Sequence, residues 1–130
     1  MSEFSGIKVL IVEDESLVAL MIEDMLQDLG CDIIASVARL KEACSIAATA
    51  ELDLAVLDIN LGEERSFPVA HILQKRGVPF MFSTGYGTAG LSAELSDSPV
   101  LSKPFSAKEL EEMLSSALAV SQSASKGSLS

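Results

Sequence analysis

Lys8-Val9-Leu10-Ile11-Val12-Glu13-Asp14-Glu15 is the most informative stretch of the chain. Its lysine is followed by four apolar residues, as expected of a parallel strand whose two faces are both covered by helices. The apolar run then ends abruptly at three acidic residues. Similar runs begin near residues 33, 54, 80 and 100, with amphipathic helical stretches between them. The sequence therefore predicts an α/β fold with a five-stranded parallel sheet.

The expected elements follow from this alternation of patterns. We expect strands over 8–12, 33–37, 54–57, 80–83 and 100–102, and helices over 16–29, 38–49, 68–76 and 106–120. The first helix should bury one face made of Val18, Met21, Ile22, Met25 and Leu29. Residues 87–99 contain several turn formers, which favours a short or mobile fourth helix. We expect residues 1–120 to form one domain and the Ser-rich stretch 121–130 to be disordered.

Composition limits the classes of function. The chain has 130 residues, the size of one ordinary domain, and a formal net charge of -10. This charge repels phosphate backbones and anionic membrane surfaces, so we expect neither nucleic acid nor a membrane as a partner. The spacing of Cys31 and Cys44 fits no metal motif, and the sequence has no signal peptide. We therefore expect a cytoplasmic protein.

Polar residues follow the predicted strands at their carboxyl ends, where open α/β sheets bind ligands. Glu13 and Asp14 follow the first strand, and Asp58 follows the third. Thr84 follows the fourth strand and Lys103 the fifth. Independent surface charges would not be distributed in this way.

Convergence of these carboxylates would require a cation. Two carboxylates about 5 Å apart repel each other by roughly 3 kcal/mol at an effective dielectric constant of 20. Oxygen ligands without histidine or thiolate favour a hard ion, and Mg²⁺ uses one or two carboxylates with several waters. The alternative for Glu13 and Asp14 alone is helix capping, because acids favour a helix N-terminus. Capping does not explain Asp58, which follows a buried strand.

About residues 5–120 resemble the receiver domain of bacterial two-component response regulators. Four ordered motifs carry this resemblance: Val12-Glu13-Asp14-Glu15, Leu57-Asp58-Ile59-Asn60-Leu61, Ser83-Thr84-Gly85 and Ser102-Lys103-Pro104-Phe105. The resemblance implies a doubly wound, flavodoxin-like sheet with strand order 2-1-3-4-5. It also implies a cis peptide bond between Lys103 and Pro104.

The resemblance further assigns roles to individual residues. Asp58 would accept a phosphoryl group from a histidine kinase or a small phosphodonor. Asp14, Asp58 and the backbone carbonyl of Asn60 would bind Mg²⁺, with Glu13 helping through water, and Thr84 and Lys103 would contact the phosphoryl group. Such a protein catalyses only its own phosphorylation and dephosphorylation. Its partners would be a sensor histidine kinase or phosphotransfer protein and a downstream protein.

Two departures from the usual receiver pattern affect how the signal would be transmitted. Val100 stands where many receivers carry an aromatic switch residue. Residues 82–87 instead resemble a subgroup marked by Phe-Ala-Thr-Gly and a nearby tyrosine, often without an output domain. Tyr86 is therefore a candidate for the switching role, and the alternative is a loop aromatic that packs over the edge of the site. The chain ends about ten residues after the last expected helix. We therefore expect output through protein contacts, as a relay, a phosphate sink or a switch.

Two other readings use the same residues. Haloacid-dehalogenase-like phosphohydrolases also combine an aspartate nucleophile with Mg²⁺, a hydroxyl and a lysine, but they place a second aspartate where this chain has Asn60. A receiver-like adaptor could instead bind its partner without phosphate. Binding that is unchanged by Asp58→Ala would favour the adaptor.

Overall fold

The computed structural model describes residues 4–85, 91, 95 and 98–129, with side chains through residue 119. Its main sheet is parallel and has the strand order β2-β1-β3-β6-β7. This order is the predicted 2-1-3-4-5, because the intervening β4 and β5 belong to a separate hairpin. The strands of the main sheet are β1 (Lys8–Val12), β2 (Asp32–Val37), β3 (Leu54–Asp58), β6 (Phe80–Thr84) and β7 (Val100–Ser102).

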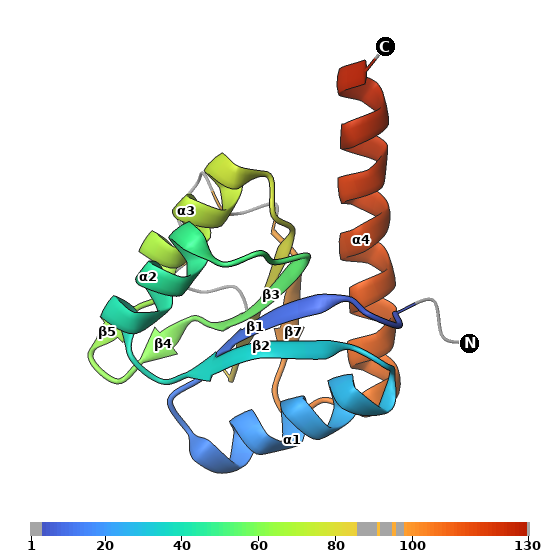
Figure 1. Cartoon of the computed structure of the whole chain (residues 1–130). Helices are drawn as coiled ribbons and strands as arrows, with labels where there is room; N and C mark the ends of the chain where they lie inside the picture. Colours follow the sequence, from blue (N-terminus) through green and yellow to red (C-terminus); the bar gives the residue numbers. More distant parts are fainter. Residues whose placement is uncertain (1–3, 86–90, 92–94, 96–97, 130) are drawn as a thin grey trace.

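Helices cover both faces of the sheet (Figure 1). Helices α2 (Leu40–Thr49) and α3 (Phe67–Arg76) lie on one face, and α1 (Ser16–Asp28) and α4 (Ala107–Leu129) lie on the other. Successive strand residues alternate between the two apolar cores, as the period of a strand requires. The core under α2 and α3 includes Leu10, Leu57 and Phe82. The core under α1 and α4 includes Ile11, Val56, Met81 and Leu101.

The buried face of α1 is rotated from the predicted one. Its fully packed residues are Ala19, Ile22 and Leu26, whereas Met21 is 38% exposed. Each residue turns the helix by about 100°, so Met21 lies at the edge of a stripe that is centred on Ile22. The prediction for Met21 was therefore wrong, because the apolar pattern of α1 is wider than the face that the sheet covers.

The polar segment after β3 is more ordered than a simple loop. Strands β4 (Asn60–Leu61) and β5 (Glu64–Arg65) pair antiparallel across a turn at Gly62. Helix α3 follows and ends at Gly77, whose φ of 71° is in the left-handed region that glycine adopts easily. The predicted stop of this helix is confirmed.

The C-terminal helix is longer than predicted. Helix α4 continues through Leu129, so the stretch 121–129 is helical, although its Ser-rich composition predicted disorder. This stretch contains no proline, and its alanine, serine and lysine residues can extend a helix that is already formed. Figure 1 shows its last turns extending away from the sheet. None of the described helices is both long and apolar enough to cross a membrane.

Most of the predicted fourth helix, within residues 87–99, lies outside the described residues. Leu95, which is described, is fully buried in the core under α2 and α3. The peptide bond between Lys103 and Pro104 is cis, as the resemblance implied.

Candidate functional site

A row of side chains crosses the carboxyl end of the sheet on the face that α1 and α4 cover. Glu13 directly follows β1, and Asp58 is the last residue of the adjacent strand β3. Each comes one residue after the pair formed by Val12 and Leu57. Strand alternation places both on the same face as Ile11 and Val56. Both are almost fully buried, with exposures of 3% for Glu13 and 5% for Asp58. Two acids are thus held side by side with little access to solvent.

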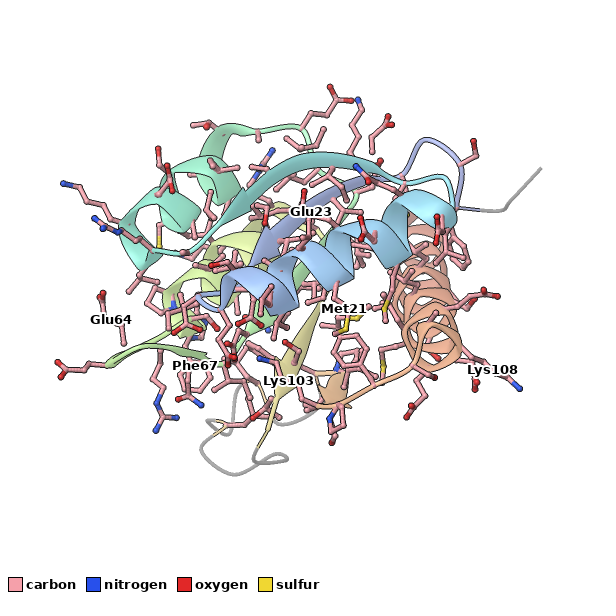
Figure 2. All side chains as sticks on the ribbon, turned by 90° about the horizontal axis from the view of Figure 1, so that it is seen from below. Met21, Glu23, Glu64, Phe67, Lys103 and Lys108 are labelled. Atoms are coloured by element: carbon pink, nitrogen blue, oxygen red, sulfur yellow. The ribbon has the colours of Figure 1, made fainter. Side chains whose placement is uncertain are left out.

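Lys103 supplies the positive charge of the site. Its ammonium group donates hydrogen bonds to Glu13 Oε1 at 2.8 Å and to Asp58 Oδ2 at 3.3 Å. The lysine follows β7, which lies two strands away from β3, so its side chain extends across β6 to reach these carboxylates. Figure 2 shows Lys103 near the ends of the strands, far from Lys108 on the outer side of α4.

A third carboxylate completes the acidic cluster. Oxygen atoms of Glu13, Asp14 and Asp58 all lie within 4.8 Å of one another. Asp14 is exposed, and the backbone N–H of Gly62 in the β4–β5 turn donates to its Oδ2 at 2.9 Å. Three carboxylates, one of them open to solvent, form an oxygen-only donor set. This set fits a hard divalent cation such as Mg²⁺ and is unsuited to softer metals.

The electrostatics of the cluster oppose ionisation of Asp58. Burial raises the pKa of Asp58 from its ordinary value of 3.8 to about 7, and the hydrogen bond and charge of Glu13 add to this effect. The charge of Lys103 and the N–H of Asn60 act in the opposite direction. For Lys103, burial alone would lower the pKa, but its carboxylate partners outweigh burial and raise it. The ammonium group therefore remains charged beside the two buried carboxyl groups.

The other predicted residues lie around this cluster. The backbone N–H of Asn60 donates to Asp58 Oδ1 at 3.2 Å. Thr84 ends β6 and is 1% exposed, one residue beyond the partner of Asp58 in that strand. Val100 is half-buried at the start of β7. Tyr86 lies outside the described residues, so its predicted switching role stays a prediction.

Two residues of the site were missed from the sequence. Gly62 holds Asp14 through its amide, and only its position in a polar turn after Asp58 could have indicated this. Ser83 pairs in register with Asp58 on the neighbouring strand. It belongs to a motif quoted for the resemblance, yet no role was assigned to it, because register depends on how the two strands pair.

Comparison with known proteins identifies the family of this fold. The family model of the response regulator receiver domain matches residues 9–115. The phyllosphere-induced regulator PhyR of Methylorubrum extorquens is 32% identical over 121 residues, which cover 90% of this chain and 45% of that protein. This chain spans about half the length of the curated relatives it matches.

Two solved structures are similar throughout the fold. The solution structure of SdrG from Sphingomonas melonis is 38% identical, with a TM-score of 0.78 over 91% of this chain and 99% of SdrG. The receiver domain of the PhyR response regulator from Erythrobacter litoralis is 30% identical, with a TM-score of 0.77 over 88% of this chain and 91% of that domain.

Proposed function

The chain belongs to the response regulator receiver family, and from that premise we propose that it accepts a phosphoryl group on Asp58 and signals through protein contacts. One observation carries this proposal. Asp58 is buried between a lysine ammonium 3.3 Å away and two further carboxylates whose oxygens lie within 4.8 Å. Burial of two acids beside a third, exposed one around a single cation is costly for a purely structural site.

The residues suit a transfer in which a carboxylate oxygen of Asp58 attacks phosphorus. The bond between phosphorus and the donor breaks, and the donor leaves with the electron pair, as a histidine imidazole or as acetate. Glu13, Asp14, Asp58 and the Asn60 carbonyl would hold Mg²⁺, which neutralises charge on the phosphoryl oxygens when bound. Lys103 would contribute its ammonium group to the same oxygens, and Thr84 its hydroxyl. Water later attacks phosphorus, the bond between phosphorus and the Asp58 oxygen breaks, and inorganic phosphate leaves while the carboxylate is regenerated.

The partners follow from this chemistry. The phosphoryl donor would be a histidine kinase or a phosphotransfer protein, and the phosphorylated form would bind a downstream protein in the cytoplasm. One similar structure is described as the anti-anti-sigma factor PhyR from Bartonella quintana. A regulator of sigma-factor control is therefore a reasonable first class of downstream partner to test for this chain.

Incubation with acetyl phosphate tests the proposal. We expect the intact mass of the wild-type protein to increase by one phosphoryl group in the presence of Mg²⁺, and not in EDTA. Asp58→Asn should gain nothing under either condition, whereas Asp24→Asn, an exposed acid on α1, should behave as wild type. If the wild-type protein gains no phosphoryl group, the phosphate-independent adaptor becomes the better reading.

A further inference from the structure

Ser83 extends the row of polar side chains at the site. Its pairing with Asp58 in β3 and with Leu101 in β7 places it on the same face of the sheet as the acidic cluster. It is fully buried, and within the part of the chain that the structure describes, its hydroxyl has no hydrogen-bond partner. Directly opposed residues on adjacent strands have Cβ atoms about 5 Å apart. The Ser83 hydroxyl is therefore a neighbour of the Asp58 carboxylate that does not bond to it in this state.

The path of Lys103 explains why the two groups do not bond. Because β6 lies between β7 and β3, the Lys103 side chain crosses β6 on its way to Asp58, on the face of the sheet that also carries Ser83. Both oxygens of Asp58 already have donors, since Oδ1 accepts from the Asn60 amide and Oδ2 from the lysine. These two donors fix the orientation of the Asp58 carboxylate, and in that orientation the serine hydroxyl makes no hydrogen bond to it.

A buried hydroxyl without a partner is unfavourable, and such groups in native proteins call for an explanation. Ser66 is also fully buried with an unpartnered hydroxyl, but it precedes α3, the helix that covers the opposite face of the sheet. Ser83 differs because an acceptor would become accessible beside it if Lys103 moved. Phosphorylation of Asp58 supplies a reason for that movement, since a phosphoryl group attracts the ammonium more strongly than a carboxylate does.

We propose that the Ser83 hydroxyl donates a hydrogen bond to the side-chain oxygen of Asp58 that carries no phosphorus, once Lys103 has moved to the phosphoryl group. This inference rests on the proposed function of Asp58. It makes Ser83 a residue that stabilises the phosphorylated form and contributes nothing to the unphosphorylated one. The hydrogen bond would favour the phosphorylated state by about three- to tenfold.

Beryllium trifluoride, which bonds to an aspartate oxygen as a phosphoryl analogue, tests this at equilibrium. Titration in saturating Mg²⁺, followed by backbone amide NMR, gives an apparent dissociation constant for each variant. We expect Ser83→Ala and Ser83→Cys to bind about three- to tenfold more weakly than wild type, because a thiol fills similar space but donates weakly. Ser66→Ala, which removes the other unpartnered hydroxyl, should bind as wild type. The dissociation constant for Mg²⁺ alone should be the same in all four proteins.

Three results separate the possibilities. Equal affinity of Ser83→Ala and wild type for beryllium trifluoride would overturn the inference and leave the proposed function standing. A lower urea midpoint for unmodified Ser83→Ala than for wild type would also overturn it, because the hydroxyl would then already be bonded before phosphorylation. Failure of the wild-type protein itself to bind beryllium trifluoride would overturn the proposed function, and this inference with it.

Discussion

Replacement of Asp58 by asparagine should stabilise the metal-free protein at alkaline pH. The carboxylate is 5% exposed beside Glu13, and its pKa of about 7 lies far above the ordinary value of 3.8. This difference corresponds to about 4 kcal/mol at most. A carboxyl whose pKa is raised by folding stabilises the folded state at low pH, and this contribution is lost as the pH rises through about 7.

The size of the effect follows from the same values. At pH 8 Asp58 is mostly ionised in the folded protein, so its raised pKa adds almost nothing to the free energy of unfolding. At pH 5, two units below the folded pKa, the protonated carboxyl contributes about 3 kcal/mol. The asparagine variant lacks this titration. We therefore expect Asp58→Asn to be more stable than wild type at pH 8, with an advantage that shrinks by about 3 kcal/mol at pH 5.

Urea unfolding in EDTA at the two pH values measures the difference directly. Asp24→Asn is the matched control, because it removes the same charge from an exposed position on α1. Its difference from wild type should change little between pH 5 and pH 8. An advantage of Asp58→Asn that is the same at both pH values, or a variant less stable than wild type at pH 8, would refute the electrostatic reasoning.

Three further perturbations probe the site and its supports. Lys103→Met leaves two buried acids without their cation and should lower the free energy of unfolding in EDTA by about 3 kcal/mol. The control Lys108→Met, at an exposed position, should change this free energy little. Equal effects of the two substitutions would contradict the pairing of Lys103 with the acids. Mg²⁺ at ten times its dissociation constant should stabilise the wild-type protein against urea by about 1.4 kcal/mol, and it should stabilise Asp14→Asn by clearly less. An equal increase in stability for both proteins would mean that the ion binds elsewhere. Gly77→Ala should lower the free energy of unfolding by about 1 kcal/mol, measured with urea or heat, because alanine disfavours a φ of 71°. An unchanged unfolding midpoint would argue against that backbone conformation.

Much of the fold was predictable because its signals are local. Most strands of the main sheet are short apolar runs, and Glu13, Asp58 and Lys103, which end or follow three of them, lie at the same edge of the sheet. The grouping of Glu13, Asp14 and Asp58 follows from that rule and is confirmed by their distances. Strand periodicity, together with the preference of ligands for the carboxyl ends of the strands, therefore indicated where the candidate site lies.

What could not be predicted depends on contacts between distant residues. The β4–β5 hairpin has two residues in each strand, too few for a periodic signal. Lys103 was expected to contact a phosphoryl group. In the unmodified protein its partners are Glu13 and Asp58, and this pairing depends on a side chain that extends across β6, which the sequence does not indicate. The position of Ser83 beside Asp58 depends on the register in which β3 and β6 pair, and the sequence alone does not determine this register.

Chemical trapping of the phosphorylated residue tests the assignment of Asp58 most directly. After incubation with acetyl phosphate and Mg²⁺, reduction with borohydride converts an acyl phosphate of aspartate into homoserine, and peptide mapping by mass spectrometry locates the change. We predict homoserine at position 58 alone, and none when Mg²⁺ is replaced by EDTA. Homoserine at position 14, or protein that gains no phosphoryl group under these conditions, would contradict the role of Asp58 as the phosphoacceptor.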